Sequence, residues 1–168
     1  RIGRAAIPVL VLAAAIGLNA GCAAAAPSCA TPAHRAFDFW LGDWKVQTPE
    51  GKAPSRSRVS KDLGGCIVRE RMDIGEGLAG ESISAYDELQ DLWVHTWVDN
   101  SGTVLRLEGR LRNGQMVLEG ESKLSERAVM SHKVTWTPLG DGSVRQRWET
   151  LSPRGEHKVV FDGRYTRP

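Results

Sequence analysis

The feature that most constrains this chain is a long succession of short alternating segments separated by turn residues. From Trp44 onward, apolar and polar residues alternate with a period of two over stretches of roughly four to eight residues, as in half-buried strands. Gly, Pro, Asn and Asp separate these stretches, and Asn113-Gly114 is a strong hairpin signal. No interval has room for a crossover helix, so neighbouring strands should pair antiparallel.

This pattern predicts ten strands, at residues 44–48, 56–63, 66–73, 81–87, 92–99, 103–111, 115–122, 129–137, 144–150 and 158–166. Before them, Phe37, Trp40 and Leu41 stand at helical spacing within residues 34–41, which predicts one short helix or turn that plugs the domain. A flat sheet of this size would expose long edges to pairing with other chains, whereas closure removes them. We therefore predict an all-β fold, a single antiparallel meander closing into a β-barrel of about ten strands.

The first 21 residues are predicted to be a signal peptide. Arg1 and Arg4 bracket a short positive region, and the apolar run that follows over residues 5–20 is shorter than the ~20 residues of a membrane-spanning helix. We expect export to the periplasm or the cell envelope. Residues 22–35 are then a tether and residues 36–168 the barrel domain.

The segment Leu18-Asn19-Ala20-Gly21-Cys22 resembles a lipobox, at which signal peptidase II cleaves before a cysteine that carries lipid. Asn19 stands where leucine is usual. The alternative is ordinary cleavage at small residues, for example after Ala24 or Ala25. A lipid on Cys22 is the one membrane contact that we predict.

Cysteine usage agrees with export. If Cys22 carries lipid, Cys29 and Cys66 remain, and an oxidising compartment allows them to form a disulfide. Closing that loop would stabilise the fold by about 4 kcal/mol through chain entropy. The alternative is two buried free thiols. No CxxC or CxxH pairing indicates a zinc site, and we predict no metal.

The charge balance excludes one class of partner. The formal net charge is +2, and removal of Arg1 and Arg4 with the signal peptide leaves the mature domain near neutral. Non-specific nucleic-acid binding needs a positive excess on one face, so nucleic acid is not an expected partner.

Three residues at the entry to the first strand resemble a known signature. Gly42-Asp43-Trp44 is similar to the G-x-W motif of the calycins, the superfamily of the lipocalins and fatty-acid-binding proteins. In that superfamily the tryptophan closes one barrel end and packs against an arginine from the last strands. The resemblance implies a lipocalin-like barrel in which Gly42, Trp44 and Arg164 form the closure, with Arg167 as the second candidate for the arginine.

A longer resemblance covers most of residues 36–167. The segments 37–44 (FDFWLGDW), 64–66 (GGC), 96–102 (TWVDNSG), 135–138 (TWTP) and 161–165 (FDGRY) are similar to a family of secreted bacterial proteins of unknown function. It implies a lipocalin-like fold and export, and no activity. The heme-binding nitrobindins are a more distant relative in shape; His157 is the one histidine near their ligand position, beside a charged loop, and we predict no cofactor.

The tryptophan-bearing faces of the strands indicate where a ligand would bind. If these faces point inward, they line a cavity of apolar aromatic walls with a few polar groups, as small-molecule sites have. The predicted lining is Trp93, His95, Trp97, Trp136, Trp148, Gln146, Glu70 and His132. Aromatic residues at period two are also typical of a plain core, and a slip of one residue would exchange the two faces.

The predicted function is that of an exported barrel that binds a small apolar or amphipathic molecule in its interior. The first alternative is a binding or inhibitory module that contacts a protein partner through its outer surface or through loops such as 74–79 or 151–156. The second is an enzyme in which two of His95, His132 and Glu70 act as acid and base, which requires hydrogen-bond reach between them. The segment 80–84 (GESIS) lacks the last glycine of a nucleophile elbow, and neither a P-loop nor HExxH occurs.

Overall fold

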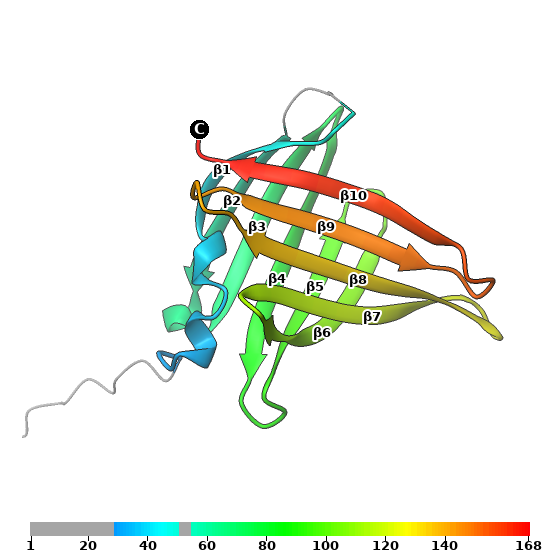
Figure 1. Ribbon diagram of the computed structural model, residues 1–168, viewed down its shortest axis with the longest axis horizontal. Coiled ribbons are helices and arrows are strands. Elements are labelled where there is room, and N and C mark those ends of the chain that lie inside the picture. The colour runs from blue at the N-terminus through cyan, green and yellow to red at the C-terminus, as the bar shows by residue number, and fades with distance from the viewer. Residues whose placement is uncertain (1–28, 51–54) are drawn as a thin grey trace, which may run out of the picture.

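A computed structural model describes residues 29–50 and 55–168 and shows a closed antiparallel barrel of ten strands (Figure 1). Each strand pairs with its neighbours in the chain, and the first pairs with the last, which confirms the predicted meander and its closure. The strands are β1 (Gly42–Gln47), β2 (Ser55–Asp62), β3 (Ile67–Gly75), β4 (Leu78–Asp87), β5 (Leu92–Asp99), β6 (Val104–Arg112), β7 (Gln115–Ser125), β8 (Ala128–Pro138), β9 (Val144–Leu151) and β10 (His157–Thr166).

Alternation along each strand sorts side chains into an interior and an outer wall. In β1, Trp44 and Val46 are buried while Asp43 and Lys45 are exposed, as the sequence predicts. The barrel closes at a seam between β1 and β10, in which Val46 pairs with Tyr165. Both side chains are buried, so the two ends of the meander share one core.

The predicted short helix or turn is present, in the form of two consecutive 3-10 turns, η1 (Ala33–Arg35) and η2 (Asp38–Trp40). A segment this short gains too few helical hydrogen bonds to offset nucleation, so packing decides its shape. Phe37 and Trp40 are fully buried, and Phe37 packs edge-on against Trp93 and Trp136 at ring-centroid distances of 5.5 and 5.1 Å. Residues 33–40, called the plug below, therefore fill one end of the barrel as predicted.

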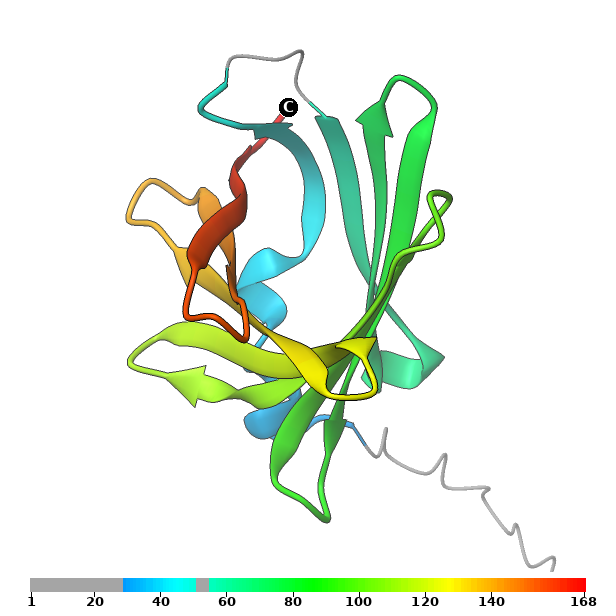
Figure 2. The ribbon, with the colours of Figure 1, turned by 90° about the vertical axis from the view of Figure 1, so that its right-hand side faces the viewer.

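The end opposite the plug is called the mouth. Because β1 starts at the plug and the strands alternate in direction, the β3–β4, β5–β6, β7–β8 and β9–β10 turns all lie at the mouth. Figure 2 faces this end, and among the described residues the helical turns lie behind the strands rather than across it. No helix in the described ranges is long and apolar enough to cross a membrane.

Two turns at the mouth are tighter than predicted. The expected loop over residues 74–79 is a turn at Glu76 and Gly77, with β3 reaching Gly75 and β4 starting at Leu78. Glu76 and Gly77 have φ values of 54° and 79°, the left-handed pair that matches the twist of a hairpin. The β7–β8 hairpin is likewise longer than predicted, since its strands reach Ser125 and resume at Ala128.

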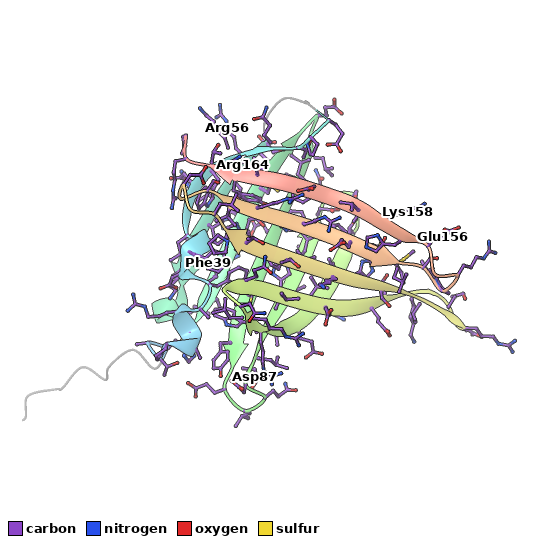
Figure 3. The ribbon with its side chains drawn as sticks, viewed as in Figure 1. Phe39, Arg56, Asp87, Glu156, Lys158 and Arg164 are labelled. Carbon is purple, nitrogen blue, oxygen red and sulfur yellow. A yellow bond between two sulfur atoms is a disulfide. The ribbon has the colours of Figure 1, made fainter. Side chains whose placement is uncertain are left out.

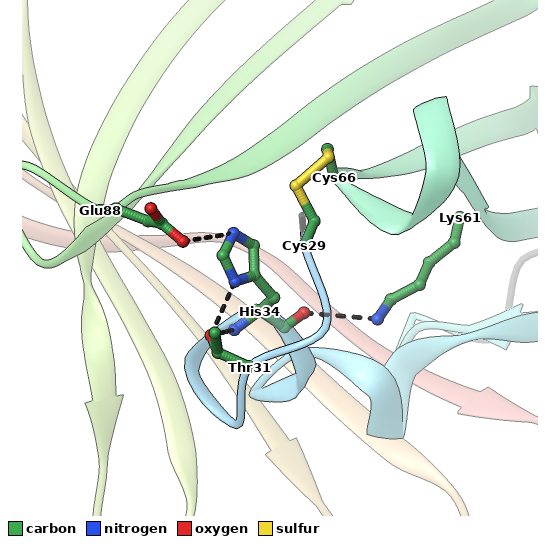
Figure 4. Close-up of a disulfide and its surroundings, with 6 residues drawn as sticks. All are labelled: Cys29, Thr31, His34, Lys61, Cys66 and Glu88. Atoms are coloured by element: carbon green, nitrogen blue, oxygen red, sulfur yellow. Dashed lines mark hydrogen bonds and ion pairs between the residues drawn. A yellow bond between two sulfur atoms is a disulfide. The ribbon is translucent and has the colours of Figure 1, made fainter. Parts of the chain in front are cut away.

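A disulfide between Cys29 and Cys66 confirms the predicted pairing and ties the segment before the plug to the start of β3 (Figure 4). The buried His34 reinforces this attachment, because its Nδ1 lies 2.7 Å from Thr31 Oγ1 and its carbonyl accepts a bond from Lys61 Nζ. The folded unit therefore extends N-terminal to the predicted boundary at residue 36. Cys22 and the predicted signal peptide lie outside the described residues.

Candidate functional site

The barrel interior brings all eight predicted lining residues onto inward-facing positions, in three levels along the axis. Near the plug, Trp93 and Trp136 are almost fully buried, and half-way up lie the buried Glu70 and His95. The remaining four are partly exposed: Trp97, His132 and Trp148 lie further toward the mouth along their strands, and Gln146 lies opposite Trp136. Burial therefore decreases from plug to mouth, so a molecule entering the mouth would first meet indole and imidazole rings.

Glu70 is the acidic centre of this interior, with an exposed fraction of 2%. Its Oε1 accepts a hydrogen bond from Ser57 Oγ at 2.6 Å and lies 3.1 Å from the Tyr165 hydroxyl. The same hydroxyl lies 2.5 Å from the side-chain oxygen of Gln146. The Tyr165 hydroxyl has one proton and can donate to just one of these two oxygens. The hydrogen bonds are all satisfied if the Gln146 amide is flipped, so that its nitrogen donates to Tyr165 and Tyr165 donates to Glu70.

The ionisation of Glu70 is displaced by its surroundings. Burial raises the pKa of this carboxyl to about 7, although the bonds from Ser57 and Tyr165 favour its charged form. A carboxyl that exchanges its proton near neutral pH, held among aromatic rings, is a typical feature of functional sites.

The two interior histidines are separate from Glu70 and from each other. His95 Nδ1 lies 2.8 Å from Ser84 Oγ, and burial lowers the pKa of His95 to about 4, so its ring is neutral at pH 7. His132 Nδ1 accepts a bond from Trp148 Nε1, so Nε2 carries the proton and donates to Ser122 Oγ at 2.7 Å.

These bonds bear on the enzyme hypothesis. Among the described residues no hydrogen bond joins any two of Glu70, His95 and His132, which is the pairing that an acid–base mechanism needs. Ser122 is not activated by His132 either, because the imidazole donates to that hydroxyl instead of accepting its proton. Within the described ranges no group of three or more His, Cys, Asp or Glu side chains is arranged to hold a metal ion.

Several interior donors remain unused within the described part of the chain. Ser82 Oγ and the indole nitrogens of Trp40, Trp93 and Trp136 are buried and have no hydrogen-bond partner there. Buried polar atoms are rarely left unpaired in folded proteins, because each one loses its bond to water on folding. Three of the four lie on the same inner face as Glu70, so the interior offers polar groups to a ligand or to water.

The barrel closure uses a different arginine from the one ranked first. The guanidinium of Arg167 stacks on Trp44, with Cζ 3.7 Å from the ring centroid, and Nη1 donates to the Leu41 carbonyl. Arg164 instead lies exposed on the outer wall, where it pairs with Asp141 (Figure 3). The reason is parity: Tyr165 points inward, so Arg164 points outward, and the chain turns over the barrel end only after Thr166.

Gly42 makes the closure possible. Its φ is 133°, and a Cβ at this position would overlap the Arg167 guanidinium at 1.7 Å. Only glycine therefore permits both this backbone conformation and the arginine that covers Trp44. Trp44 Nε1 also donates to the Trp40 carbonyl at 2.9 Å, which joins the closure to the plug.

Two hollows lie on the outer wall. The larger, about 1050 Å³, crosses β1 to β5, and the charged side chains on its lining include Lys45, Arg56, Arg58, Arg71 and Glu81. The smaller, about 720 Å³, crosses β6 to β10 and is lined by four glutamates with Lys133 and His157. Sequence reasoning did not anticipate either hollow, because a concave outer wall results from strand twist and coiling.

Sequence reasoning also missed Ser57, Ser82, Ser84 and Tyr165, which hold or face the polar centre. In β4 the inward positions are Ser82 and Ser84, while Ile83 is 41% exposed. The available signal was the pairing of small polar residues at period two in a strand next to the Glu70 strand.

No family model matches the chain, and a comparison with curated proteins finds no significant similarity. The structure itself agrees with a calycin-like architecture, since it combines a closed ten-strand antiparallel barrel, an N-terminal plug and an arginine stacked on the tryptophan of the G-x-W segment.

Proposed function

We propose that this protein binds a small apolar or amphipathic molecule inside the mouth of its barrel. The observation that carries the proposal is the gradient of the inner face, from half-buried aromatic rings at the mouth to a buried polar centre at Glu70. Apolar walls with a few convergent polar groups are the usual composition of small-molecule sites.

The aromatic part of the site comes from both sides of the barrel. Trp97 belongs to β5, whereas Trp148 and Phe161 belong to paired positions of β9 and β10. All three are only partly buried, although rings of this size gain about 1.5–3 kcal/mol when fully covered. A bound apolar group would cover the part of these rings that the fold leaves open.

The first test is native mass spectrometry of the protein purified from the cells that make it. The expected result is a co-purifying small molecule that is lost on denaturation. Protein that carries nothing, and that also fails to bind any apolar probe in solution, would contradict the proposal.

A second test uses the fluorescence of N-phenyl-1-naphthylamine, a neutral apolar probe. Trp97→Gln and Trp148→Gln should each weaken binding about tenfold, because an aromatic anchor is worth at least ~1.4 kcal/mol. Val98→Gln is the matched control, since Val98 neighbours Trp97 and points outward. Weaker binding in the control, with no effect of the two inner variants, would move the site to the outer wall.

That outcome would favour the alternative function, a surface that binds a protein partner. The observation in its favour is the larger outer hollow, at whose border Val98 is 44% exposed. Ile83, Val94 and Val104 are further exposed apolar residues on the wall of β4 to β6. Capture of a partner by the wild type but not by Val98→Gln, with the interior variants unchanged, would support this alternative.

The proposal includes export to the cell envelope. The Cys29–Cys66 disulfide supports it, because such bonds persist mainly in oxidising compartments. The test is the mass of the mature protein from cells grown with and without globomycin, which blocks signal peptidase II. Lipid on Cys22 predicts accumulation of the precursor under globomycin; normal processing would indicate ordinary cleavage instead.

A further inference from the structure

The chemical character of the ligand is indicated by the charges on the inner face. Glu70 and Asp99 are the acids that occupy inward positions between the plug and the mouth. Among the described residues two lysines occupy inward positions: Lys61, which lies near the plug and pairs with Asp38, and Lys158, which is exposed at the rim. Neither lysine pairs with Glu70 or Asp99, so these two acids have no cationic partner among the described residues.

The acid at the rim is already satisfied. Partial burial acts to raise the pKa of Asp99, but hydrogen bonds from Ser101, Trp97 and Thr103 outweigh it and lower this pKa to about 2. Asp99 is thus charged and bound at the end of β5, where its Oδ2 accepts the Trp97 Nε1 bond at 3.1 Å. It fixes the Trp97 indole and leaves Glu70 as the acid available to a ligand.

Glu70 has one oxygen that takes part in neither of its hydrogen bonds. Ser57 and Tyr165 both approach Oε1, which leaves Oε2. Ser82 is the cross-strand partner of Glu70 on β4, so their Cβ atoms are about 5 Å apart, and its buried hydroxyl has no partner in the described residues. One ligand group that offers two or more hydrogens could satisfy both atoms.

Aromatic rings surround this pair. Trp97 is the cross-strand neighbour of Ser82, and its ring lies over Gly80, since a Cβ there would come within 2.2 Å of the indole. Tyr165 approaches from the other side of the barrel. The faces of such rings attract cations, and the attraction is stronger where water is excluded.

We propose that the ligand carries a protonated primary or secondary amine, whose ammonium group bridges Glu70 and Ser82 beneath Trp97 while its apolar body lies toward the mouth. This inference rests on the proposed function and adds the class of the head group. An ammonium supplies the missing positive charge and the missing hydrogens at once.

The test compares three probes of equal chain length, octylamine, octanol and octanoate, by isothermal titration calorimetry at pH 8. The expected result is that octylamine binds at least about tenfold more tightly than octanol, and octanoate least tightly. In Glu70→Gln the preference for the amine over the alcohol should disappear, while octanol binding stays within about threefold of wild type.

Two further variants separate the head-group site from general effects. Ser82→Ala should weaken octylamine more than octanol, because it removes one acceptor from the bridge. Glu108→Gln removes the same charge from the outer wall and should change neither affinity. Thermal unfolding of each variant verifies that it is folded before titration.

The proton balance gives an independent readout. Below neutral pH, an ammonium that pairs with Glu70 must displace the proton of that carboxyl, so about one proton should be released at pH 5.5 and none at pH 8.5. Tyr165 of β10 is the titratable group that bonds to Glu70, and its neighbours on β2, β3 and β4 include the uncharged Ser57, Val59, Met72 and Ser82. His95 and Asp99 on β5 bind Ser84 and Trp97 instead.

The outcomes are distinguishable. Equal affinity for octylamine and octanol, with no proton release, would overturn the amine while leaving a barrel that binds apolar molecules, its polar pair then being bridged by water. Tighter binding of octanoate would assign the head group to Lys158 at the rim and would equally refute the amine. Absence of binding by all three probes would contradict both the amine and the proposed function.

Discussion

At the scale of single residues, two buried ionisable side chains act on stability in opposite directions. The pKa of Glu70 is raised by burial to about 7, and that of His95 is lowered by burial to about 4. Between these values the folded state holds a proton on Glu70 that the unfolded state has released, and lacks a proton on His95 that the unfolded state has bound. The contribution of Glu70 to the free energy of unfolding is therefore lost as pH rises from about 4.5 to 7. The contribution of His95 is lost as pH falls from 6.5 to 4.

The first prediction is that replacing either Glu70 or His95 reveals the pH dependence of stability that the other residue causes. In the wild type the two slopes largely cancel between pH 4.5 and 6.5. Glu70→Gln should leave a stability that rises with pH over this range, and it should exceed the wild type at pH 8 by up to about 3 kcal/mol. His95→Gln should leave a stability that falls with pH. Urea unfolding across this range measures both, and parallel profiles in all three proteins would refute the prediction.

A second prediction separates the two arginines of the C-terminal strand region. Arg167→Ala removes the cation over Trp44 and the bond to the Leu41 carbonyl, and should lower the free energy of unfolding by about 1–2 kcal/mol. Arg164→Ala removes an exposed pair with Asp141 and should change stability little. Chemical denaturation of both proteins measures this difference, and a larger loss for Arg164→Ala would restore it as the closing arginine.

The sequence predicts inward positions well where the strand contains large aromatic residues, and less well where it does not. Trp93, His95 and Trp97 share a face with indoles at both ends, so the face of β5 was predictable. In β4 the pattern misleads, because Ile83 points outward while Ser82 points inward. Tertiary pairing with Glu70 decides which face of β4 points inward, and the sequence hints at it just through the two small polar residues Ser82 and Ser84 at period two.

At the scale of elements, the plug is held in place by attachments at both of its ends. Before it stands the Cys29–Cys66 disulfide, and after it Trp44 donates to the Trp40 carbonyl. The plug itself has no regular helix and depends on Phe37 and Trp40, both fully buried. Its position was predictable from those aromatics, whereas its 3-10 form was not, because packing rather than propensity sets the shape of so short a segment.

The third prediction concerns the disulfide. It spans 37 positions of the chain, and its loss should lower the free energy of unfolding by about 4 kcal/mol, since the unfolded chain gains the freedom that the closed loop denied it. The measurement is urea unfolding of the wild type with and without reductant. The control is the double variant Cys29→Ser and Cys66→Ser, whose free energy of unfolding should be the same with and without reductant. Equal stability of oxidised and reduced wild type would be inconsistent with this role.

At the scale of the whole molecule, the seam between β1 and β10 is the shortest stretch of pairing in the barrel. It joins register positions Lys45, Val46 and Gln47 to Arg164–Thr166, whereas β8 and β9 pair along nearly their full length. Closure was predictable from the number of strands and the cost of exposed edges. The shortness of the seam was not, since it depends on the shear of the strands around the barrel.

The fourth prediction follows from this seam. Amides of β10 that face β1 should exchange with deuterium faster than those of Val134 and Trp136 in β8, because local opening starts where the fewest bonds must break. Hydrogen exchange monitored by mass spectrometry measures this order. Uniform protection around the barrel would show that the plug and Arg167 secure the seam fully.

The meander has an even number of strands, so the chain leaves the barrel on the side where it entered. Cys29 lies at the plugged side through its bond to Cys66, and the C-terminal end follows Arg167, which stacks on Trp44 at the same side; Figure 1 marks this end. A surface to which the protein is attached by either end would thus leave the mouth of the barrel facing the surrounding solution. Immobilisation through a C-terminal tag should for the same reason leave capture of small molecules unhindered.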